Sequence, residues 1–125
     1  MSYIDGFVLP LKDDQLDEYT KLAEMFAKKA VSHGAIGSVE AIGDGLEHGK
    51  TTDFFRAVNA EEGENVVFSF VVWPDKATRD SAWEKIMADP EMQPGAQPMP
   101  FDGKRMFWGG FKPFVSTLER ATADA

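Results

Sequence analysis

The chain has 125 residues, 21 of them acidic and 13 basic, which gives a net charge of −8. This charge opposes binding to nucleic acid or to an anionic membrane as the main partner. The sequence contains no cysteine, which excludes disulfides and thiolate metal sites.

The length and the N-terminal residues indicate one soluble domain. No shift in composition divides the chain, so we expect a single domain over residues 1–125, with a loosely ordered tail from about residue 116. The first ten residues lack the basic start of a secretory signal. The longest apolar run, Val66–Trp73, is too short to cross a bilayer. We therefore expect a cytoplasmic protein.

The first part of the chain predicts a strand, a helix and a second strand. Tyr3–Leu11 is rich in aromatic and aliphatic residues and is typical of a strand. Apolar residues then recur at three- and four-residue steps, which predicts a helix that begins after Asp13 or Asp14 and ends near His33. Ile36–Asp44 predicts the second strand.

The second part of the chain repeats this order. Val66–Trp73 is the clearest strand, and Asp75 is the expected cap of a helix that reaches about Ala88. Pro90–Pro100 contains four prolines and is expected to be irregular, and Arg105–Val115 predicts the last strand. The order predicts an α+β fold of the ferredoxin-like, split βαβ type, with a four-stranded antiparallel sheet and two helices on one face.

The predicted sheet is apolar on both faces. In Val66–Trp73 both alternating sets of side chains are apolar apart from Ser69. Two helices cover only one face of a sheet, and an uncovered apolar face of several hundred Å² is unusual in a monomer. The pattern therefore predicts a homodimer in which two sheets pack face to face. The alternative is that the long loop and the tail cover this face within one chain.

Four segments resemble one known family. They are MPFDGKRMFWGGF at Met99–Phe111, the opening YIDGFVLPL, the strand SVEAIGD, and FSFVVWPDKATRD. Together they are similar to the YbaA-like family of uncharacterised bacterial proteins. The resemblance implies a dimeric α+β barrel, in which two ferredoxin-like sheets pair. The wider superfamily includes cofactor-free monooxygenases, muconolactone-type isomerases and haem-binding members, but the family itself supplies no activity to carry over.

No motif in the sequence indicates a cofactor. The chain lacks a phosphate-binding glycine loop, a dinucleotide fingerprint and a nucleophile elbow. The spacing of His33, Glu40, Asp44 and His48 matches no metal-binding pattern, so we expect neither a metal nor a cofactor.

Two residues are candidate general bases. If the strand face that carries Glu40 meets the helices, this carboxyl is a semi-buried acid suited to base catalysis. If that face meets solvent or a lysine of a partner chain, Glu40 is structural, and Asp5 presents the same two alternatives. His33 is the other candidate, and its alternative role is to cap the end of a helix.

Aromatic residues and one arginine are the candidate ligand-binding residues. Trp83, Trp108 and Phe111 are predicted to line a pocket between sheet and helices, with Arg105 at its rim to hold a carboxylate or phosphate. The alternatives are an aromatic core and an arginine in a salt bridge. The predicted function is the binding of a small apolar or carboxylate ligand. The alternatives are a cofactor-free monooxygenase- or isomerase-like enzyme and a purely structural or regulatory dimer.

Overall fold

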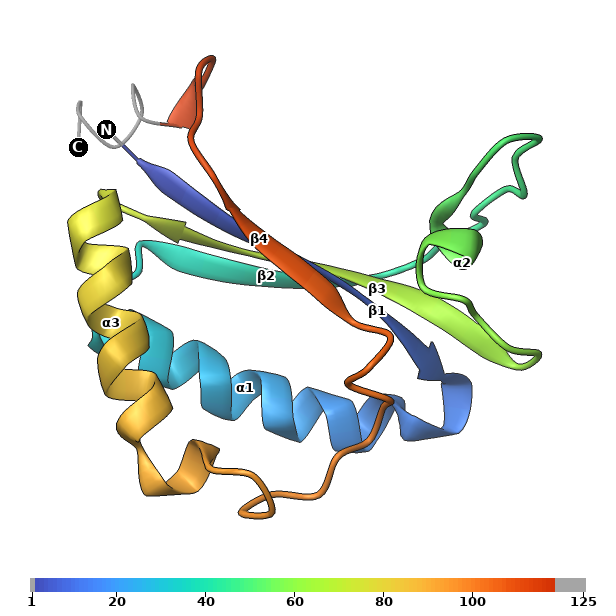
Figure 1. Ribbon diagram of the computed structural model, residues 1–125, viewed down its shortest axis with the longest axis horizontal. Helices are drawn as coiled ribbons and strands as arrows, with labels where there is room; N and C mark the ends of the chain where they lie inside the picture. The colour runs from blue at the N-terminus through green and yellow to red at the C-terminus, as the bar shows by residue number, and fades with distance from the viewer. Residues whose placement is uncertain (1, 119–125) are drawn as a thin grey trace.

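The computed structural model describes residues 2–118 and contains an antiparallel four-stranded sheet in the order β2-β3-β1-β4. The strands are β1 (Tyr3–Lys12), β2 (Gly37–Ile42), β3 (Glu64–Trp73) and β4 (Phe107–Phe111). The helices are α1 (Leu16–Ser32), α2 (Phe54–Ala57) and α3 (Lys76–Ala88), with short 3-10 turns at Asp13–Gln15 and Pro90–Met92. Helices α1 and α3 lie on one face of the sheet (Figure 1). The ferredoxin-like prediction is confirmed.

The ends of the two long helices follow local capping chemistry. The His33 backbone N–H donates to the carbonyls of Lys29 and Ala30, and Gly34 follows with a φ of +112°, a conformation that suits glycine. The Asp75 side chain accepts a 2.7 Å hydrogen bond from the Thr78 backbone N–H at the start of α3. The predicted end of α1 near His33 and the predicted Asp75 cap of α3 are therefore confirmed, and α3 ends at Ala88 as expected.

Strand β4 is shorter than the predicted Arg105–Val115, because Arg105 belongs to the turn before it. The Arg105 backbone N–H donates to the Asp102 carbonyl, which closes this turn. Within the strand, a Cβ at Gly110 would overlap the Tyr3 ring and the Arg79 guanidinium. Glycine at this position therefore makes room for two side chains on the helix-facing side of the sheet.

The two faces of the sheet are covered differently. The face toward α1 and α3 carries buried side chains such as Leu9, Leu11 and Val71. On the opposite face, Val8 and Val66 pack with Val58 from the connector between β2 and β3, which includes α2. Figure 1 shows α2 above one end of this face. Part of the second face is thus covered within the chain by this connector. Leu118, in the predicted tail, lines a small hollow on the same face with Val39, Phe70 and Val72.

The rest of the second face is apolar and open. Phe68, Phe107 and Phe111 project from it and are 46%, 48% and 63% exposed. The prediction that both faces of the sheet are apolar is confirmed. The homodimer stays a prediction. The predicted tail lies mostly outside the described residues, and the single domain over residues 1–125 also stays a prediction. Across residues 2–118, no helix combines the length and apolarity needed to span a membrane.

Candidate functional site

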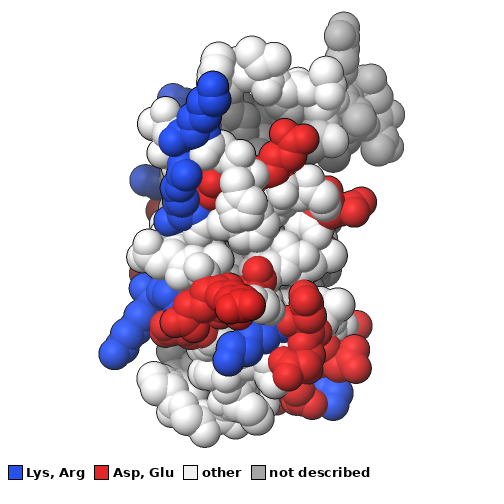
Figure 2. Space-filling view, turned by 90° about the vertical axis from the view of Figure 1, so that its right-hand side faces the viewer, with Lys and Arg blue, Asp and Glu red and all other residues white. Residues whose placement is uncertain are grey.

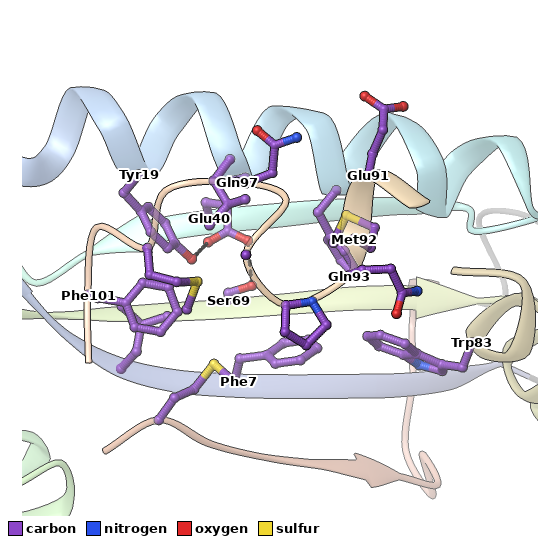
Figure 3. Close-up of a pocket in the computed structure, with 18 residues that line it drawn as sticks. Phe7, Tyr19, Glu40, Ser69, Trp83, Glu91, Met92, Gln93, Gln97 and Phe101 are labelled. Carbon is purple, nitrogen blue, oxygen red and sulfur yellow. Dashed lines mark hydrogen bonds between the residues drawn. The ribbon is translucent and has the colours of Figure 1, made fainter. Parts of the chain in front are cut away.

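A cavity of about 520 Å³ lies between α1, the helix-facing side of the sheet and the segment that follows α3 (Figure 3). Its walls are mostly apolar, and many of the side chains are aromatic or methionine. The aromatic ones are Phe7, Tyr19, Phe26, Trp83 and Phe101, and the methionines are Met92, Met99 and Met106. The segment 91–99, which comes from the proline-rich loop, closes one side of the cavity.

A carboxylate held by two hydroxyl groups is the polar centre of this cavity. Strand β2 places Glu40 directly opposite Ser69 of β3, on the face that meets the helices. The Ser69 hydroxyl donates to Glu40 Oε2 at 2.6 Å, and the Tyr19 hydroxyl, from the start of α1, donates to Oε1 at 2.5 Å. The three groups point toward one another in Figure 3. A carboxylate at a cavity wall is able to bind a donor or to take up a proton.

Burial fixes the protonation state of the tyrosine in this group. Burial of the phenol, and then the hydrogen bond to the neighbouring Glu40 carboxylate, raise the pKa of Tyr19 well above its ordinary value. Tyr19 therefore stays protonated at physiological pH and acts as a donor. Glu40 is exposed as a residue and lines the cavity.

The far wall of the cavity is a cluster of aromatic rings oriented by a buried carboxylate. Trp83 lies 5.5 Å from Phe26 and 6.3 Å from Phe7, measured between ring centroids. Its indole N–H donates a 2.8 Å hydrogen bond to Asp5, which is completely buried. Asp5 also accepts from Trp73 and from Arg79, whose Nη2 lies 2.7 Å away. Asp5 therefore fixes this wall and does not line the cavity.

The loop that closes the cavity is anchored to α1 by one lysine. Lys29 Nζ lies 2.7 Å from Asp89 and 2.9 Å from Glu91, and its side chain is 15% exposed. The Gln93 side-chain amide donates to the backbone carbonyls of Met87 and Asp89. These contacts hold the start of the loop against both helices.

The four predicted ligand-binding residues are not all at the cavity. Trp83 lines it, whereas Trp108 is 53% exposed and stacks on Phe7 at 6.0 Å, next to the cavity wall. Phe111 projects from the opposite face of the sheet, at 63% exposure. Arg105 lies elsewhere, in a network of ion pairs. The structure therefore brings Trp83 and Trp108 together and separates them from the other two.

Arg105 is fully engaged by residues of its own chain. Its guanidinium forms two hydrogen bonds with Glu64, at 2.6 and 2.8 Å, and a third with Asp102 at 3.0 Å. These bonds with Arg105 hold the pKa of Glu64 below its ordinary value. Figure 2 views this end of the molecule, where acidic side chains crowd around a smaller number of basic ones. Arg105 therefore joins β3 to the turn before β4.

The two predicted bases are far apart. His33 is the C-cap of α1, and Tyr19, which binds Glu40, lies in the first turn of the same helix. A separation of 14 residues corresponds to roughly 20 Å along a helix. Glu40 lies on the strand face that meets the helices, which is one of the two predicted alternatives, and it lines the cavity. His33 occupies the capping position. Their catalytic roles stay predictions.

The sequence patterns do not mark Tyr19 and Ser69 as site residues. Tyr19 belongs to the apolar stripe of α1, so its spacing predicts a core residue and gives no sign that its hydroxyl binds a carboxylate. Ser69 was visible as the single polar residue in the run VVFSFVVW, and a buried hydroxyl in such a run needs a hydrogen-bond partner. That requirement is the signal that points to a polar group on a neighbouring strand.

Residues 2–103 match a family model described as "Protein of unknown function (DUF1428)". The chain belongs to the DUF1428 family. It is 44% identical over 115 residues to "Uncharacterized protein YbaA" of Escherichia coli K12, an alignment that covers 92% of this chain and 98% of YbaA. The YbaA sequence of Shigella flexneri gives the same values. The resemblance to the YbaA-like family is thereby confirmed.

Solved structures also resemble this DUF1428 chain. "Structure of Rv0793 from Mycobacterium tuberculosis" aligns with a TM-score of 0.49 and 11% identity, covering 94% of this chain and 99% of that one. A de novo designed protein, Foldit4, aligns with a TM-score of 0.46 and 9% identity, covering 90% of this chain and 99% of that one.

Proposed function

We propose that this protein binds a small organic molecule in the cavity beneath the proline-rich loop. The observation that carries the proposal is the cavity of about 520 Å³, which has mostly apolar walls and the Glu40 carboxylate as its polar centre. Ligand sites in proteins are typically apolar concavities of about 300–1,000 Å³ with a few placed polar groups. Since Arg105 is engaged by Glu64 and Asp102, the proposal does not depend on an arginine at the site.

A cavity-filling substitution tests this proposal. Leu22 lines the cavity from α1, so Leu22→Trp places an indole in the ligand space. Glu24→Trp is the matched control, because it adds the same side chain at an exposed position of the same helix. We expect phenylbutanol, a neutral probe, to bind the wild type and Glu24→Trp in calorimetric titrations, and to bind Leu22→Trp at least about tenfold more weakly. Equal binding to all three proteins would place the probe outside the cavity and refute the proposal.

We also propose that the protein is a homodimer joined through the open face of the sheet. The chain carries a net charge of −8, which opposes self-association. Among the described strand positions on this face, only Lys12 and Glu64 are charged, and they lie opposite each other at one end of the sheet. Phe68, Phe107 and Phe111 project from the rest of the face. A second copy would bury these rings while both sets of charges stay in water. This support is independent of the cavity.

A further inference from the structure

The polar groups around Glu40 can accept hydrogen bonds from a ligand but have no proton left to donate. The inference drawn from this rests on the proposed binding function and specifies the class of ligand. A hydroxyl group has one proton to donate, and the hydroxyls of Tyr19 and Ser69 both donate theirs to Glu40. What remains around Glu40 is a set of oxygen lone pairs. A ligand that meets these groups must therefore supply the hydrogen-bond donor itself.

The N–H donors of two other polar side chains of the cavity are also engaged. The Trp83 indole N–H donates to Asp5, and the Gln93 amide donates to the carbonyls of Met87 and Asp89. Of the described side chains that line the cavity, only Gln97 keeps a free N–H donor. A ligand carboxylate or phosphate would leave most of its acceptors unsatisfied here, which is costly.

The charge of the cavity has one sign. Among the described residues that line it, Glu40 and Glu91 are charged, and none is a lysine, arginine or histidine. Glu91 pairs with Lys29, 2.9 Å away, which also pairs with Asp89, whereas Glu40 forms no salt bridge with any described residue. The net charge of −8 adds a long-range attraction for cations.

The apolar walls determine the rest of the ligand. Figure 3 shows Glu40, Tyr19 and Ser69 toward one end of the cavity and Trp83 toward the other. Rings and methionines line the space between them, and aromatic faces attract cations as well as apolar groups. We infer that the cavity binds an organic amine, whose ammonium group donates hydrogen bonds to Glu40 and whose apolar body extends toward Trp83.

Three probes of matched shape test this inference in the wild-type protein. Phenylbutylamine, phenylbutanol and phenylpentanoate carry the same phenylbutyl body and differ in their charged or neutral end. In calorimetric titrations at neutral pH we expect the amine to bind roughly tenfold or more tightly than the alcohol, a difference of about 1.4 kcal/mol. We expect the acid to bind more weakly than the alcohol.

Two variants assign this preference to one carboxylate. Glu40→Gln should lower the affinity for the amine to that for the alcohol and leave the affinity for the alcohol nearly unchanged. Glu24→Gln is the matched control, because it removes one acidic group at an exposed position of α1 outside the cavity and should preserve the preference for the amine. If a variant does not fold, the comparison of the three probes in the wild type still shows whether the cavity prefers an amine.

The outcomes separate this inference from the proposed function. If the alcohol or the acid binds the wild type as tightly as the amine or more tightly, the amine inference is overturned, while the cavity remains a binding site. The inference is equally overturned if Glu40→Gln retains the preference. If none of the three probes binds the wild type, the result contradicts the binding function itself.

Discussion

At the scale of single residues, the most constrained group is the carboxylate of Asp5. It is 0% exposed and accepts hydrogen bonds from two indoles and from the guanidinium of Arg79. The hydrogen bonding between Arg79 and Asp5 raises the pKa of Arg79 above its already high ordinary value, so the arginine stays charged. A buried carboxylate of this kind is tolerated only while its charge and its lone pairs are matched.

Loss of this charge is therefore expected to destabilise the fold. Asp5→Asn keeps the shape of the side chain but leaves Arg79 without its buried counter-charge, and we expect it to lower the free energy of unfolding by about 3–5 kcal/mol. Asp80→Asn is the control, because Asp80 pairs with the same arginine at 2.9 Å but is half exposed. Its cost should stay below about 1 kcal/mol. Urea unfolding measures the free energy of unfolding of both variants. A similar loss in Asp5→Asn and Asp80→Asn would contradict the view that burial makes the Asp5 charge important.

At the scale of elements, the loop after α3 depends on a few polar anchors. Lys29 is largely buried between α1 and the loop, where it pairs with Asp89 and Glu91. The bonds with Lys29 hold the pKa of Asp89 below its ordinary value. Beyond these anchors the chain runs over the cavity through Gly95, which has a φ of +84°.

Removal of the lysine should release the loop without unfolding the protein. Lys29→Met keeps the length of the side chain and removes its charge, so we expect thermolysin to cut near Met92, Met99 or Phe101 several-fold faster than in the wild type. Lys28→Met is the matched control, since Lys28 is an exposed neighbour on the same helix. Cleavage at the same rate in both variants would show that other contacts hold the loop.

Elements were easier to predict from the sequence than the contacts between them. The boundaries of α3 and the end of α1 followed from caps and apolar spacing, which are local signals. Simple alternation along β2 is enough to set Glu40 on the same face as Ser38 and Ile42, as the register shows. The register that sets Glu40 opposite Ser69 joins positions 29 residues apart, and no local pattern encodes it.

Arg105 illustrates the same limit for the site. Its sequence context, a tight turn before an aromatic strand, fits an anion-binding corner as well as a salt bridge. Its actual partner Glu64 is 41 residues away in the chain, and only the fold brings the two together. The sequence could indicate a pocket between sheet and helices, but it could not identify the side chains that share it.

At the scale of the whole molecule, the second face of the sheet is the surface proposed for self-association. The connector that contains α2 covers one end of this face through Val58 and its neighbours. The uncovered part keeps Phe68, Phe107 and Phe111 in water. Isolated exposed rings are ordinary, but a contiguous set on a flat sheet is typical of an interface.

Light scattering on a sizing column tests the dimer. We expect a mass near twice the 13.8 kDa of one chain at micromolar concentration. Phe68→Glu should shift the mass toward that of one chain, because it places a negative charge on the apolar face. The control is Met87→Glu, since Met87 is 67% exposed on α3, away from the sheet. A wild-type mass of one chain would refute the proposal.

The position of Trp83 also gives the protein an internal optical reporter. One edge of its indole is fixed by buried Asp5, and its ring forms part of the cavity wall. A molecule that enters the cavity displaces water from this ring, so the emission of Trp83 should move to shorter wavelength. Trp73 binds the same carboxylate at 0% exposure and should contribute a constant background. Cavity occupancy is thus readable from intrinsic fluorescence, without any attached label.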